Sequence, residues 1–184
     1  MGFSLLFGVT AFPVGNAVAP QTVAPAAPAI PSYAVTMTAY NAVPEQTDGD
    51  PFETASGAYS NPDIIAARSR DLADELPFGT IVEVDGSTIT SDKTCGFGAV
   101  EHHIGYRVIE DTMNARYTDR VDVLLDKRAN VRADDGTLLN GASVMGICKG
   151  VTVRVVGFVD INHLPKTQAA LAALVEKGTA LAMK

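Results

Sequence analysis

The chain has 184 residues, of which 47% are hydrophobic, and a formal net charge of −7. This length fits one folded domain with appended segments, because domains commonly hold about 100–150 residues. The hydrophobic content indicates a packed core and excludes a largely disordered chain. The acidic balance argues against nucleic acid as a partner, because binding phosphates needs a basic face.

The first 32 residues are expected to lie outside the folded domain. Residues 1–19 contain an apolar run followed by Ala17-Val18-Ala19, a small-x-small pattern typical of a secretory signal, although no basic residues precede the run. This segment predicts either export to the periplasm or cell envelope, or a hydrophobic tether to a membrane. Residues 20–32 are rich in Pro and Ala and predict an extended linker.

Short strands separated by turn-rich loops predict a mainly-β domain over residues 33–162. Alternating or β-branched segments indicate strands at 34–43, 80–84 and 151–159, a short apolar segment near 64–68, and two strands within 106–128.

The connecting segments carry turn residues. Residues 44–62 read as a long loop, and residues 91–105 as a hairpin or an inserted loop. Asp-Gly and Asn-Gly within 132–143 predict turns. The Ala- and Leu-rich end of the chain predicts a helix within 163–184 that packs on the barrel or pairs with another chain.

The two cysteines, Cys95 and Cys148, leave two alternatives open. They form a disulfide if the chain is exported, or they remain two buried thiols. Their spacing fits no zinc pattern, so we expect no metal and no cofactor.

The segment around residue 122 is where chemistry is expected. Val121, Val123 and Leu125 alternate with Arg120 and Asp122. Because side chains alternate along a strand, the apolar set faces one way while Asp122 and Arg120 face the other. An acid held on a rigid strand, facing away from the main apolar set, is a candidate catalytic group.

The order of motifs resembles the 3D, or Asp-Asp-Asp, domain of stationary-phase survival proteins and MltA-type lytic transglycosylases. The resemblance rests on MTAYN (37–41), TASG (54–57), the segment 64–84, and EDTMNARYTDRVDV (110–123). It covers about Val35 to Val159. It implies a six-stranded double-psi β-barrel of the RlpA-like kind, followed by the C-terminal helix.

The resemblance also implies an activity. The three family aspartates would be Asp71, Asp111 and Asp122, the last two eleven positions apart. Asp122 would act as general acid and base, with Asp71 and Asp111 lining the same groove. The implied reaction is that of a peptidoglycan lytic transglycosylase, which cleaves the MurNAc–GlcNAc bond of glycan strands and leaves a 1,6-anhydro product.

Such chemistry needs a carboxyl group that is still protonated near neutral pH. Burial or neighbouring carboxylates raise the pKa of an acid, so we expect Asp71 and Asp111 to raise that of Asp122. Arg120 allows two interpretations: it binds substrate carboxylates, or it lowers the pKa of Asp122 and weakens the acid.

Thr38, Tyr40, Arg120 and Asn114 are the candidate substrate-binding residues. Tyr40 offers a ring for stacking on a sugar, although residues at Thr38 and Tyr40 are more often barrel packing. Met113 and Asn114 stand where the family usually has glycines. The alternative function is a barrel of the expansin or RlpA-like kind that binds cell-wall polysaccharide without cleaving it.

Overall fold

The computed structural model describes residues 1–2, 30–47, 50–89, 93–133 and 135–178. The predicted signal or tether lies outside these residues except at residues 1–2, and so does the predicted linker up to residue 29. Within the described part of the chain, no helix is long and apolar enough to cross a membrane.

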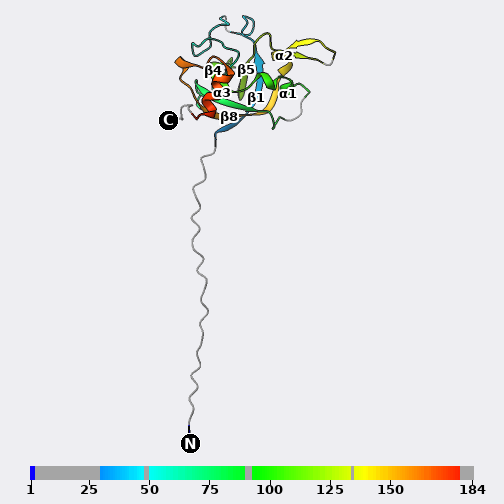
Figure 1. Cartoon of the computed structure of the whole chain (residues 1–184). Coiled ribbons are helices and arrows are strands. Elements are labelled where there is room, and N and C mark those ends of the chain that lie inside the picture. The colour runs from blue at the N-terminus through cyan, green and yellow to red at the C-terminus, as the bar shows by residue number, and fades with distance from the viewer. Residues whose placement is uncertain (3–29, 48–49, 90–92, 134, 179–184) are drawn as a thin grey trace.

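Six strands close into a barrel, and the mainly-β prediction is confirmed (Figure 1). Their order around the barrel is β1-β5-β2-β4-β3-β8. The strands are β1 (Ser32–Tyr40), β2 (Ile65–Arg68), β3 (Thr80–Asp85), β4 (Arg107–Thr112), β5 (Arg120–Leu124) and β8 (Cys148–Phe158).

Strands that are neighbours in space are mostly not neighbours in sequence. β5 lies between β1, to which it is parallel, and β2, to which it is antiparallel. β2 also pairs with β4 in parallel, and the remaining pairs are antiparallel. β1 and β2 do not pair with each other, and residues 41–64 connect them.

Alternation along the strands builds two hydrophobic clusters. The first draws side chains from all six strands, including Met37, Val121 and Val123, and is the barrel core. The second draws on the other strand faces and includes Leu124 together with Leu171 of the C-terminal helix. The predicted orientation of Val121 and Val123 is therefore confirmed, and both faces of β5 carry apolar residues.

Residues 97–103 are helical, so the hairpin offered for this segment is wrong there. A short helix α1 (Phe97–Val100) continues into the 3-10 turn η2 (Glu101–His103). The segment just before α1 is fixed to the barrel by a disulfide between Cys95 and Cys148, with Cα atoms 4.7 Å apart. This resolves the two alternatives for the cysteines, and the bond holds α1 beside the start of β8.

The two predicted turns after β5 have different structures. Asp135-Gly136 lies in the hairpin between β6 (Asn130–Arg132) and β7 (Leu138–Asn140), as expected. Asn140 instead caps helix α2 (Gly141–Met145), where its side chain accepts hydrogen bonds from two backbone amides. Asn-Gly therefore starts a helix here.

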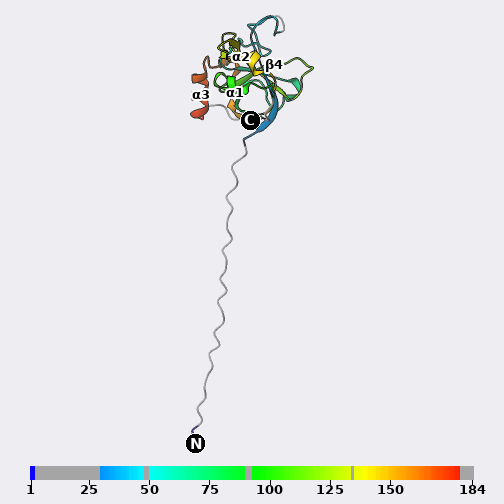
Figure 2. The same cartoon turned by 90° about the vertical axis from the view of Figure 1, so that its right-hand side faces the viewer.

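The C-terminal helix α3 (Gln168–Glu176) follows the short turn η3 (Ile161–His163) and lies against the outside of the barrel (Figures 1 and 2). Thr167 caps its first turn, and Leu171 is fully buried in the second hydrophobic cluster. The prediction of a helix that packs on the barrel is confirmed over these residues. Residues 179–184 lie outside the described part.

Candidate active site

A row of aligned residues crosses four adjacent strands. Thr38 of β1 pairs with Asp122 of β5, Asp122 pairs with Ala67 of β2, and Ala67 pairs with Asp111 of β4. Neighbouring strands lie about 4.8 Å apart, so the Cα atoms of Asp111 and Asp122 are about 10 Å apart. Ala67 carries only a methyl group, which leaves space between the two carboxyl groups.

Asp122 is half-buried, and only one of its carboxyl oxygens is occupied. Oδ1 accepts a hydrogen bond of 2.8 Å from the hydroxyl of Thr38. Oδ2 has no hydrogen-bond partner among the described residues. Burial raises the pKa of Asp122 to about 6, and the charge of Asp111 adds to this, whereas Thr38 and Arg120 act in the opposite direction.

Asp111 is held by three donors. Its Oδ1 accepts the backbone amides of Ala55, at 3.0 Å, and of Thr112, at 2.8 Å. Its Oδ2 accepts the hydroxyl of Tyr40 at 2.9 Å. Because both oxygens are occupied, the side chain is fixed in place. Its charge acts on Asp122 from a constant position.

Tyr40 is a buried residue that positions Asp111. Only 8% of Tyr40 is exposed, so its ring offers no open face for a sugar, in contrast to the predicted stacking role. Burial, followed by the charge of Asp111, raises the pKa of its hydroxyl well above the ordinary value. The hydroxyl therefore remains a hydrogen-bond donor to Asp111.

Asp71 lies apart from the row. It is exposed in the turn η1 (Arg70–Leu72), and its Oδ2 accepts the backbone amide of Asp119 at 2.8 Å. This hydrogen bond lowers the pKa of Asp71. Asp119 has a φ of 51°, the one positive value at a non-glycine position in the described chain. Asp71 thus supports the turn into β5, and its charge is not among those that act on Asp122.

The expected cluster of three aspartates is therefore a pair with a separate third member. Asp111 alone supplies the like-charge repulsion that the sequence led us to expect from Asp71 as well. The physical reason is that Asp71 follows the end of β2, whereas Ala67 inside that strand occupies the position between the two acids.

Arg120 does not prevent the pKa of Asp122 from being raised. Its charge lowers the pKa of Asp122, but this effect is smaller than those of burial and Asp111, and the net shift is upward. Its guanidinium carbon lies 4.8 Å from the centre of the Tyr117 ring.

The turn after β4 contains Met113 and Asn114, neither of which has a backbone conformation that requires glycine. Met113 is buried in the second hydrophobic cluster. Asn114 is exposed, and its side-chain oxygen accepts the backbone amide of Arg116 at 3.1 Å. Neither residue has a positive φ. Asn114 forms a turn in this structure, and its predicted contact with substrate stays a prediction.

Several residues of the site carry no sequence signal. Ala55 belongs to the TASG motif, but no sequence pattern predicts that its backbone amide donates a hydrogen bond to Asp111, 56 positions away. Glu110 is fully buried, and burial raises its pKa. Buried Arg107 donates to the carbonyls of Pro62, Leu124 and His103.

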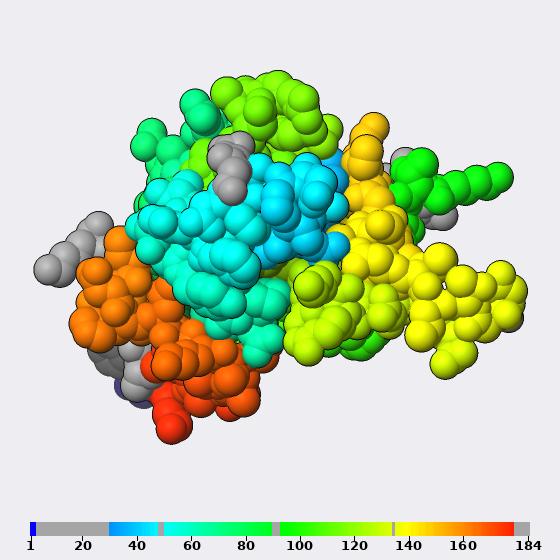
Figure 3. Space-filling view, turned by 90° about the horizontal axis from the view of Figure 1, so that it is seen from above, coloured from blue at the N-terminus to red at the C-terminus, as the bar shows by residue number. Residues whose placement is uncertain are grey.

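Figure 3 shows the face that carries the long loop after β1. The loop 50–61 (cyan) lies beside the end of β1 (blue) and near the turn 113–119 (light green). The Ala55 contact with Asp111 joins this loop to β4.

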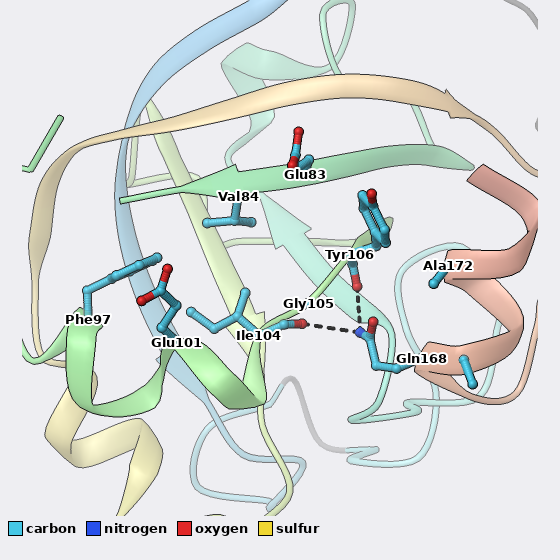
Figure 4. Close-up of a pocket in the computed structure, with 10 residues that line it drawn as sticks. Glu83, Val84, Phe97, Glu101, Ile104, Gly105, Tyr106, Gln168 and Ala172 are labelled. Atoms are coloured by element: carbon cyan, nitrogen blue, oxygen red, sulfur yellow. Dashed lines mark hydrogen bonds between the residues drawn. The ribbon is translucent and has the colours of Figure 1, made fainter. Parts of the chain in front are cut away.

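A separate pocket of about 500 Å³ lies between β3, η2 and α3 (Figure 4). Its lining includes Phe97, Ile104 and Tyr106, and Gln168 of α3 donates hydrogen bonds to the carbonyls of Ile104 and Tyr106. No residue of the aspartate row lines it. Among the described residues, no group of three or more His, Cys, Asp or Glu is arranged to hold a metal ion.

No protein-family model matches the chain, and neither does any curated protein. The resemblance to the 3D domain therefore rests on the order of motifs quoted above.

Proposed function

We propose that the chain is a double-psi β-barrel of the 3D-domain kind that cleaves peptidoglycan glycan strands as a lytic transglycosylase. The observation that carries this proposal is the state of Asp122. It is half-buried, its pKa is raised to about 6, and its Oδ2 has no partner among the described residues. A carboxyl group of this kind can donate a proton near neutral pH and accept it back.

The proposed reaction uses one acid and no water. Protonated Asp122 gives its proton to the oxygen that bridges MurNAc and GlcNAc while the bond from that oxygen to C1 breaks. The ionised Asp122 then accepts the proton of the C6 hydroxyl of the same MurNAc. The C6 oxygen bonds to C1, which closes the 1,6-anhydro ring and leaves Asp122 protonated again.

Asp111 acts in this proposal as a positioning residue. Three donors hold its carboxylate, so it is not free to approach the sugar as a second acid. Its fixed charge helps to keep Asp122 protonated.

The barrel supports the double-psi assignment through its strand order. β1 pairs with β5 and β2 with β4, both in parallel, in a closed six-stranded barrel. The disulfide between Cys95 and Cys148 supports export, because such bonds persist in oxidising compartments such as the periplasm.

A second candidate function is a barrel that binds cell-wall polysaccharide without cleaving it. The observation that favours it is Met113, whose side chain is buried where the family has a glycine. A larger residue beside Asp111 changes how closely a sugar approaches the backbone.

Digestion of purified sacculi separates the two candidates. We expect the wild type to release anhydro-muropeptides detectable by mass spectrometry, and Asp122→Asn to release none. Asp135→Asn is the matched control, because it changes an exposed carboxylate in the β6–β7 hairpin. Binding to sacculi without any product from the folded wild type would favour the second candidate and reject the first.

A further inference from the structure

Two arginines contact one tyrosine on the turn that leads into β5. The guanidinium carbons of Arg116 and Arg120 lie 4.7 and 4.8 Å from the centre of the Tyr117 ring. Arg116 also donates a hydrogen bond of 2.8 Å from Nη2 to the Tyr117 hydroxyl. We call these two arginines the arginine pair on Tyr117. The ring restrains both side chains, because guanidinium groups stack favourably on aromatic faces.

Neither arginine forms an ion pair within the described structure. The ion pairs there involve Arg128, Arg154 and His163. The Arg120 side chain donates no hydrogen bond among the described residues, and Arg116 is exposed. Their remaining N–H groups are open to an external acceptor.

The arginine pair lies beside the candidate acid. Arg120 precedes Asp122 by two residues on β5, which places it on the same face about 7 Å away along the strand. Tyr117 packs against the second hydrophobic cluster, which also contains Tyr40 and Met113.

We propose that Arg116 and Arg120 bind a carboxylate of the glycan, so that the site selects acidic over neutral glycan strands. The inference rests on the proposed function and names its substrate class more narrowly. A planar guanidinium matches a carboxylate through two parallel hydrogen bonds. The Tyr117 ring orders both side chains in advance, which lowers the entropy lost on binding.

The proposed bond cleavage supplies such a carboxylate. The muramyl sugar, whose C1 bond breaks, carries a lactyl group that ends in a free carboxylate on denuded strands. On peptide-bearing strands that group is amide-linked, and carboxylates of the stem peptide replace it. A strand of N-acetylglucosamine alone carries neither group, so it would leave both guanidinium groups without an acceptor.

The test is calorimetric binding with the full-length Asp122→Asn protein, which removes the proposed acid. The ligands are a denuded (GlcNAc–MurNAc)₂ tetrasaccharide, the same tetrasaccharide with its lactyl groups amidated, a muropeptide with free stem carboxylates, and neutral chitotetraose. Arg116→Gln and Arg120→Gln are compared with Arg132→Gln, an exposed arginine of the β6–β7 hairpin. Tyr117→Phe keeps the ring and removes the hydroxyl that holds Arg116.

Each of Arg116→Gln and Arg120→Gln is expected to weaken binding of an acidic ligand by about tenfold, because a hydrogen-bonded charged group contributes roughly that factor. Arg132→Gln and chitotetraose should show no such loss. If the amidated tetrasaccharide binds as weakly as chitotetraose, the lactyl carboxylate is the group bound. A dependence confined to the muropeptide assigns it to the stem peptide.

Equal affinity for acidic and neutral ligands, affinity that neither arginine substitution changes, or no binding of any ligand would overturn the inference. Its failure is distinct from failure of the proposed function. Anhydro-muropeptides released by an Arg116→Gln, Arg120→Gln double variant at the wild-type rate and KM would reject the carboxylate site alone. Arginine-dependent binding by a wild type that releases no product would reject the transglycosylase alone.

Discussion

Asp122→Asn is expected to stabilise the folded protein at neutral pH, although it removes the proposed acid. The ordinary pKa of this carboxyl group is 3.8, and burial in the folded protein raises it to about 6. Each pKa unit corresponds to about 1.4 kcal/mol, so ionised Asp122 reduces the free energy of unfolding by about 3 kcal/mol.

The sign of the effect fixes its pH dependence. Between pH values near 4 and near 6, the folded protein binds this proton and the unfolded chain does not. The contribution of Asp122 to stability therefore falls as pH rises through this window, and the full loss is present above about pH 6. The carboxamide of Asn does not ionise, and its oxygen can still accept the Thr38 hydroxyl.

Urea denaturation of both proteins, followed by circular dichroism, measures the difference. At about pH 4 the two free energies of unfolding should nearly agree, and at about pH 7.5 the variant should be more stable by up to about 3 kcal/mol. Asp135→Asn is the control, because the pKa of Asp135 is lowered and its removal brings no gain at neutral pH. An Asp122→Asn protein equal to or less stable than wild type at both pH values would refute the reasoning.

Three further predictions concern the acid, the disulfide and the turn into β5. Asp111→Asn removes the charge that helps to raise the pKa of Asp122, so the fall in kcat/KM at high pH should move to lower pH; an unchanged pH–rate profile would contradict this. Replacing both Cys95 and Cys148 by serine removes a disulfide that joins residues 53 positions apart. It should lower the free energy of unfolding, measured in urea, by about 4 kcal/mol. Equal stability of the oxidised wild type and the variant would contradict this prediction. Asp119 has a φ of 51°, so Asp119→Val should lower the free energy of unfolding by about 1–2 kcal/mol, whereas Asp119→Gly should not. Equal melting temperatures for the two variants would show that this backbone conformation is not strained.

The sequence predicted strands well because each strand has a periodic pattern of its own. Val121 and Val123 face the barrel core because their alternation with Asp122 is a property of the segment itself. The order of strands around the barrel could not be read in the same way, since it depends on which distant segments pair. The short helix α1 could not be predicted, because the four residues that follow Cys95 and Gly96 are too few to show a helical period.

The site was predictable where a side chain carries the signal. Asp111 and Asp122 were named from the order of motifs, and the structure aligns them across Ala67. The position of Asp71 could not be predicted, because it depends on where β2 ends. Tyr40 was assigned to the substrate because aromatic character is visible in a sequence, whereas its burial follows only from the assembled second cluster.

The most direct test of the central claim is a titration of the Asp122 carboxyl group by carbon-13 NMR, assigned by comparison with Asp122→Asn. The structure leads us to expect a pKa of about 6 in the wild type, and a lower value in Asp111→Asn. A pKa at or below 3.8, the ordinary value, would show that Asp122 is ionised throughout the neutral range, which would contradict its proposed role as the proton donor.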